Sequence, residues 1–115
     1  MTKFVLLFRM DITTPGAQPD KEKMRTYMQQ WMDWIAGISG SGRLADGGNH
    51  LASTGRVLRK NAVVPGPYLS DTVSVAGYII VLAENIEEAT AMASQCPILQ
   101  GDANSVEIRE VASPG

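Results

Sequence analysis

Apolar residues fill both alternating positions along two segments of this chain, which distinguishes these segments from the other extended ones. They are residues 4–8 and residues 75–83. Residues 55–60 and 105–111 instead mix polar and apolar positions. A strand that is apolar on both faces must be covered on both faces. The pattern therefore predicts two central strands, two edge strands, and a partner that covers whatever face the helices leave open.

The spacing of apolar residues and turn residues predicts the remaining elements. Strands are expected at residues 3–9, 55–60, 72–83 and 105–111, with loops at residues 40–54 and 61–71. A helix is expected at residues 19–38, starting at Pro19, and a second one after the cap Asn85. The predicted core stripe of the first helix is Met24, Met28, Trp31, Ile35 and Ile38, and that of the second is Ile86, Ala89, Ala93 and Cys96.

This order, β-α-β-β-α-β, predicts an α+β fold of the ferredoxin-like type, an antiparallel sheet with two helices on one face. The other face carries either Phe4, Phe8 and Ile79 or Val5, Leu7 and Ile80, depending on the register. Both sets are apolar, and an exposed apolar patch of this kind marks an interface. We therefore expect a homodimer in which two such faces pack together about a two-fold axis.

Length and composition narrow the class of protein. The 115 residues predict a single domain, residues 1–115, with a formal charge of −2. Acidic and basic residues are interspersed, so no direct nucleic-acid partner is expected. The single cysteine cannot form an internal disulfide, and the apolar runs are too short to span a membrane. These features together predict a cytoplasmic protein that does not contact a membrane.

Several short motifs, taken in order, resemble the YCII-related, or DGPF-domain, family. They are the residues KFVLLFR at 3–9, GRLADGG at 42–48, VPGPY at 64–68, GYIIVLA at 77–83, CPIL at 96–99 and VEIREV at 106–111. The resemblance spans nearly the whole chain and implies a dimeric α+β barrel of ferredoxin-like subunits. Some members of the family are described as transcription-initiation proteins, through association with extracytoplasmic-function sigma factors. Others are suspected enzymes, because a histidine and an aspartate line a cleft.

The chain departs from the family at its central Asp-Gly-Pro-Phe motif. Pro65 stands in place of the aspartate and Tyr68 in place of the phenylalanine. The resemblance therefore implies that any chemistry of that aspartate is lost here. Asp71, six residues after Pro65, is the carboxylate that we expect to reach the same region.

His50 is the candidate acid–base residue, because it is the only histidine and its side chain titrates near neutrality. Asp46 lies four residues before it in the glycine-rich segment, and a carboxylate there would fix its tautomer. Asp46 and Asp71 complete the candidate catalytic set. A solvent-exposed histidine in a loop is the simpler interpretation. One histidine among scattered carboxylates has no metal-ligand spacing, so neither a metal nor a cofactor is expected.

Arg9, Tyr68 and Ser70 are the candidate ligand-binding residues. Arg9 ends the first strand, where it would bind a substrate carboxylate or pair with a glutamate of the neighbouring edge strand. Tyr68 and Ser70 follow a segment that Pro65 and Pro67 pre-order. Either the segment holds them at the mouth of a pocket, or it is a turn in which Tyr68 simply packs. The predicted walls of that pocket are residues 46–50, residues 65–71 and the end of the first strand.

Two functions fit these observations. The first is a homodimer that binds a small molecule or serves a regulatory complex, with a link to transcription initiation. The alternative is a small enzyme that needs no cofactor and uses His50 as acid or base. A closed cavity that contains both His50 and Tyr68 would favour the enzyme, whereas His50 in solvent would favour the binding protein.

Overall fold

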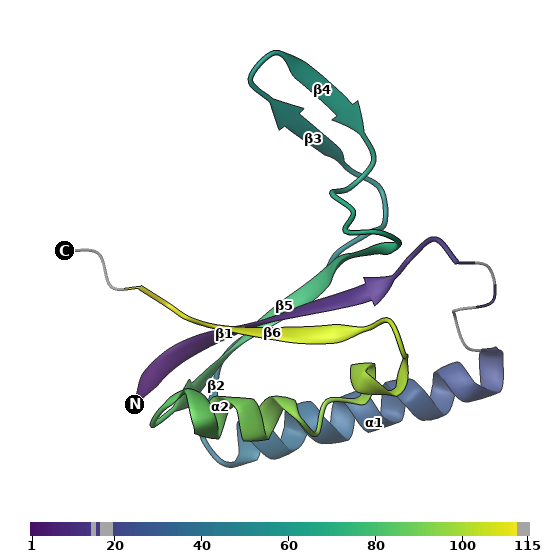
Figure 1. Cartoon of the computed structure of the whole chain (residues 1–115). Coiled ribbons are helices and arrows are strands. Elements are labelled where there is room, and N and C mark those ends of the chain that lie inside the picture. Colours follow the sequence, from purple (N-terminus) through teal and green to yellow (C-terminus); the bar gives the residue numbers. More distant parts are fainter. Residues whose placement is uncertain (15, 17–19, 113–115) are drawn as a thin grey trace.

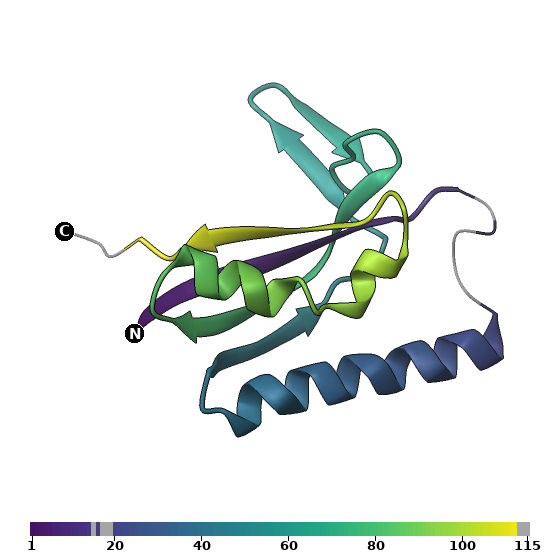
Figure 2. The same cartoon turned by 60° about the horizontal axis from the view of Figure 1, so that its bottom comes forward.

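The computed structural model describes residues 1–14, 16 and 20–112. Its elements in chain order are β1 (Thr2–Asp11), α1 (Lys21–Gly40), β2 (Leu44–His50), β3 (Arg56–Arg59), β4 (Ala62–Pro65), β5 (Val73–Ala83), α2 (Ile86–Ala93), the short 3₁₀ helix η1 (Pro97–Gln100) and β6 (Ser105–Glu110). Four of the strands form an antiparallel sheet in the order β2-β5-β1-β6. Both α-helices lie on the same side of this sheet (Figure 1, Figure 2). The chain thus has an α+β fold that is compatible with the ferredoxin-like type.

The two doubly apolar strands, β1 and β5, are the central pair of the sheet, as predicted. Their register pairs Thr2 with Ala83 at one end and Asp11 with Val73 at the other. The register also decides which residues face the helices. Phe4, Leu6, Phe8, Ile79 and Val81 are buried in the core, whereas Val5, Leu7, Tyr78, Ile80 and Leu82 are only partly buried. We call this second set the open face, because within the described residues no helix covers it (Figure 1).

The prediction of the edge strand beside β5 was wrong. That strand is β2, within the segment that was expected to be a loop at residues 40–54. Its sequence, LADGGNH, carries almost no apolar pattern, and its pairing with β5 shifts register twice. Gly48 makes the pairing possible: its φ is +61°, and a Cβ at this position would lie 1.6 Å from the Tyr78 carbonyl oxygen. Only glycine, without a side chain, fits there.

Residues 55–60 therefore do not belong to the main sheet, and residues 61–71 are not all loop. They contain β3 and β4, which pair only with each other in a separate two-stranded hairpin. We call this hairpin, residues 56–65, the arm. It projects away from the sheet on the side opposite to the helices (Figure 1). The predicted order β-α-β-β-α-β thus gains one hairpin between its second and third strands.

The helix ends follow their caps. The Asp20 side chain accepts a hydrogen bond from the Lys23 amide, so α1 begins at Lys21, and the predicted start, Pro19, lies outside the described residues. The Asn85 side chain likewise accepts from the Glu88 amide, as predicted for α2. The reciprocal half of a capping box is absent among the described contacts, because the Glu88 carboxylate pairs with Arg43 instead.

The core stripe of each helix is slightly rotated from its predicted position. On α1, Trp31 and Ile38 are buried and Tyr27 and Trp34 pack against them, whereas Met28 is exposed. On α2, Ala89 and Ala93 are buried, and Cys96 just beyond the helix is buried as well, but Ile86 is exposed. The aromatic rings explain the shift, because Trp31 makes edge-to-face contacts with Phe8 of β1 at 4.9 Å and with Trp34 at 5.4 Å. None of the described helices has a long enough apolar stretch to cross a lipid bilayer.

Candidate functional site

A hollow of about 620 Å³ lies at the base of the arm. It forms where the two ends of the arm return to the sheet beside the end of β1 and the start of β5. Its polar lining consists of Arg9, Thr54, Arg56, Tyr68, Ser70 and Ser74. Its apolar lining consists of Leu51, Ala52, Pro67, Val73 and Val75, with Gly55 between the two segments. We call this site the basal hollow.

Backbone hydrogen bonds hold the walls of the basal hollow in place. The Gly66 amide donates to the Gly55 carbonyl over 2.8 Å, which closes the base of the arm. The buried Ser74 hydroxyl donates to the Tyr68 carbonyl over 2.6 Å, which fixes the proline-rich segment to β5. The Tyr68 ring itself is 66% exposed. Its backbone is therefore fixed while its ring and hydroxyl remain available to a ligand.

A tight turn at residues 70–73 connects the proline-rich segment beside the basal hollow to β5. Ser70 and Val73 exchange two backbone hydrogen bonds, of 2.8 and 3.0 Å. Asp71, between them, has a φ of +61°, a conformation that aspartate tolerates better than most residues. Asp71 therefore has a local structural role in this turn.

Arg9 reaches the basal hollow from β1 and is also paired with a glutamate. Its guanidinium donates to Glu107 of β6, which accepts from Arg109 through its other carboxylate oxygen. The hydrogen bond and the charge of Arg9 hold the pKa of Glu107 below its ordinary value. This pairing stabilises the folded chain fully above the ordinary glutamate pKa, and the effect is lost as the pH falls through the lowered pKa. Both side chains are about one-third exposed, so the guanidinium can exchange this partner for a ligand.

The structure brings Arg9, Tyr68 and Ser70 together on one hollow. The wall beside them is made by residues 51–56 and not by residues 46–50, which form β2. Arg56 and Thr54 were absent from the predicted binding set. Arg56 lies in the segment that was assigned to the main sheet, and Thr54 ends the segment that was expected to be a loop. The sequence does contain a signal for these two residues. The segments that connect the arm to the sheet are long and rich in glycine, serine and proline, which is typical of loops.

His50, Asp46 and Asp71 do not converge. His50 pairs with Gly77 on the helix-covered side, where its exposed ring contacts Trp31 edge to face at 6.2 Å. The Asp46 carboxylate accepts from the Gly48 amide two residues ahead. Within the described part of the chain, no hydrogen bond or ion pair joins His50 to either carboxylate. An acid–base pair therefore gains no support from the geometry.

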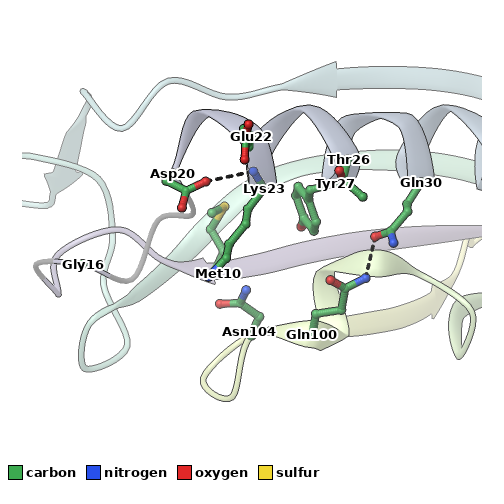
Figure 3. Close-up of a pocket in the computed structure, with 11 residues that line it drawn as sticks. Met10, Gly16, Asp20, Glu22, Lys23, Thr26, Tyr27, Gln30, Gln100 and Asn104 are labelled. Carbon is green, nitrogen blue, oxygen red and sulfur yellow. Dashed lines mark hydrogen bonds between the residues drawn. The ribbon is translucent and has the colours of Figure 1, made fainter.

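A larger cavity, of about 740 Å³, lies between the first turns of α1, the end of β1 and η1 (Figure 3). Some of its polar groups already have partners: Asp20 caps α1, and the Gln100 amide donates to Gln30 over 2.7 Å. The Asn104 side chain makes two hydrogen bonds: it accepts one from the Asp11 amide and donates one to the Ile98 carbonyl. These bonds stabilise the fold, while the side chains of Glu22, Lys23 and Thr26 also line the cavity.

Tyr27 forms part of the wall of this larger cavity. Burial raises the pKa of its hydroxyl, and a hydrogen bond with Trp31 partly offsets the effect. Burial thus favours the neutral form of this hydroxyl.

Within the described residues, no three histidine, cysteine or acidic side chains lie together as a group that could hold a metal ion. No family model matches the chain, and no curated protein is a significant match to it. The class that the fold and the site define is thus an α+β protein with an open apolar sheet face and a hollow that contains two arginines. The resemblance to the YCII-related family stays a prediction.

Proposed function

We propose that this chain is a homodimeric module that binds a small organic anion in the basal hollow. One observation carries the proposal: the described residues that line this hollow include two guanidiniums and four hydroxyls but not one carboxylate. Such a lining attracts negative charge. The apolar wall at Leu51, Pro67 and Val75 suits the carbon skeleton of the same ligand.

Arg9 is the residue that we assign to the carboxylate of the ligand. A guanidinium presents parallel N–H groups that match the two oxygens of a carboxylate. Its present partner, Glu107, accepts from one guanidinium nitrogen only, so a carboxylate already lies against this group. Tyr68 and Ser70 then supply hydroxyls for a second polar group of the ligand, and the Tyr68 ring covers its apolar part.

The dimer is the second component of the proposal. The open face presents Val5, Leu7, Ile80 and Leu82 side by side on the two central strands, and a second copy packed on it would cover them. This arrangement corresponds to the dimeric α+β barrel that the resemblance implies. The basal hollow lies at one end of that face, close to where the second copy would begin. A link to transcription initiation remains a prediction from the resemblance alone.

Calorimetric titration with benzoate and succinate tests the binding function. Both carry a carboxylate, and benzoate adds an apolar ring that suits the hollow. Arg9→Gln should weaken binding by about tenfold or more, because a hydrogen bond to a charged group is worth roughly 1.5–3 kcal/mol. The matched control is Arg25→Gln, which removes an exposed arginine of α1. His50→Ala should leave the affinity unchanged.

Two outcomes would count against the proposal. One is the failure of both carboxylates to bind the wild-type chain at millimolar concentration. The other is equal loss of affinity in Arg9→Gln and Arg25→Gln, which would assign the binding to general charge. A loss confined to His50→Ala would favour the acid–base enzyme instead.

A further inference from the structure

The arm buries little of its own apolar surface. Leu58 is 75% exposed and Val63, its partner across the hairpin, is 61% exposed. All four residues of β4 are exposed. A two-stranded hairpin of this kind is marginally stable alone, and its unpaired edges and apolar side chains favour association. The arm therefore has the surface of an element that packs against something outside its own subunit.

The arm is also the most cationic part of the chain. Arg56 lies at its base and Arg59 and Lys60 near its tip, and residues 55–66 contain no acidic residue. Since the formal charge of the chain is −2 and the arm contributes +3, the remainder carries −5. Among the described ion pairs, none involves these three cations. A partner for the arm should thus be acidic and partly apolar.

The opposite end of the sheet has that chemistry. The pairing of Thr2 with Ala83 places the turn from β5 into α2 at this end, away from the arm. Glu84, Glu87 and Glu110 are exposed here. Three cations lie nearby, of which Arg43 and Arg109 already pair with Glu88 and Glu107, so Lys3 is the one without an ion pair among those described. Ile86, 47% exposed, and Val111 add an apolar component. We call this surface the acidic end.

Two limiting arrangements bring the open faces of two copies together about a two-fold axis that lies between them. If the two-fold axis runs along the strands, each arm lies beside the other arm, and like charges meet. If the axis runs across the strands, each arm lies over the acidic end of the other copy. The arm rises on the same side as the open face (Figure 1), so a copy that covers this face must meet the arm in either case. Charge complementarity selects the second arrangement.

We propose that each arm reaches across the dimer and covers the acidic end of the second copy, so that the two subunits hold each other reciprocally. Leu58 and Val63 would pack against Ile86 and Val111 of the other copy, and Arg59 and Lys60 would face Glu84 and Glu87. The inference rests on the proposed dimer and specifies its orientation, which the open face alone leaves undetermined.

The surface area of the chain is consistent with a large interface. The accessible surface is 7815 Å², against about 6,100 Å² expected for a folded monomer of this mass. The radius of gyration is 15.4 Å, against about 13 Å for a compact domain of this length. The excess of roughly 1,700 Å² exceeds the ~800 Å² that each partner contributes to a standard interface. A second copy that covers both the open face and the arm would remove surface on this scale.

Cysteine cross-linking tests the orientation. In a Cys96→Ala background, Leu58→Cys and Ile86→Cys are combined and treated with a short bis-maleimide. Because positions 58 and 86 lie at opposite ends of one subunit, the expected product is a covalent dimer. Leu58→Cys alone is the matched control: it cross-links only if two arms lie side by side. Leu58→Cys with Met32→Cys, on the exposed side of α1, should give no product.

Charge reversal supplies a second, independent measurement. Arg59→Glu with Lys60→Glu should weaken the dimer by about tenfold or more at low salt, and adding Glu84→Lys with Glu87→Lys should restore it. A covalent dimer from Leu58→Cys alone would overturn the proposed contact between the arm and the acidic end. A dimer whose affinity charge reversal does not change would overturn it as well. Neither result would contradict the dimer itself. A monomer in light scattering would overturn both.

Discussion

At the residue scale, Arg9 has two competing partners in the proposed function, the Glu107 carboxylate and the ligand. Glu107→Gln removes the charge of the first partner and leaves the guanidinium freer to bind the second. An exposed ion pair is weak, so the affinity for benzoate should rise only by roughly two- to fivefold. Glu110→Gln, on the same strand but distant from the hollow, is the control. An unchanged or weaker affinity in Glu107→Gln would show that Arg9 does not hold the ligand.

Substitution of Trp31 tests how much this single side chain contributes to the packing of the core. It is buried and contacts the rings of Phe8, Trp34, Tyr27 and His50. Trp31→Ala should lower the free energy of unfolding by about 3–5 kcal/mol, as expected for a buried aromatic side chain. Denaturant unfolding measures the change, with the exposed Met32→Ala as control. A Trp31→Ala variant as stable as Met32→Ala would contradict the structural role assigned to this ring.

At the element scale, β2 depends on one glycine. Gly48 has a positive φ and lies against the Tyr78 carbonyl, so an added methyl group would push β2 away from β5. Gly48→Ala should destabilise the chain by roughly 1–3 kcal/mol and reduce amide protection along β2 in hydrogen exchange. Gly47→Ala is the matched control, because nothing lies within 4 Å of its position and its φ is not positive. Equal protection in the two variants would contradict this role for Gly48.

The same strand shows where sequence patterns are informative and where they are not. β1, β5 and β6 were predictable, because alternating or continuous apolar residues mark strands that border a core. β2 was not, because its pairing relies on the close backbone approach that Gly48 and Gly77 allow, and a glycine-rich segment predicts a loop. The first strand of the arm was assigned to the main sheet, since it mixes polar and apolar residues like an edge strand, and its second strand was assigned to a loop.

The candidate site was predictable to a similar extent. Antiparallel pairing of β1 with β5 places the end of β1 beside the start of β5, so Arg9 had to lie near Tyr68 and Ser70. Arg56 and Thr54 required knowledge of how the base of the arm folds back, which no local pattern encodes. His50 was expected near Arg9 and Tyr68 only if the predicted loop at residues 40–54 curled inward. Residues 44–50 of that segment form β2 instead.

At the scale of the whole molecule, the proposed dimer rests on the open face. Ile80 lies on this face and Ile79 lies in the core, so a charge at position 80 should break the dimer and leave the subunit folded. We expect light scattering at micromolar concentration to report twice the chain mass for the wild type and a monomer for Ile80→Glu. Met32→Glu places the same charge on the exposed side of α1 and should remain dimeric. A wild-type monomer would contradict the dimer.

The central claim is that the basal hollow, and not His50, binds the ligand. The most direct measurement is an NMR titration of the wild-type chain with benzoate. Signals of the Arg9 guanidinium, the Tyr68 ring and the Ser70 amide should shift together along one binding curve, while those of the His50 ring stay in place. Shifts at His50 with none at Arg9, Tyr68 and Ser70 would contradict the account.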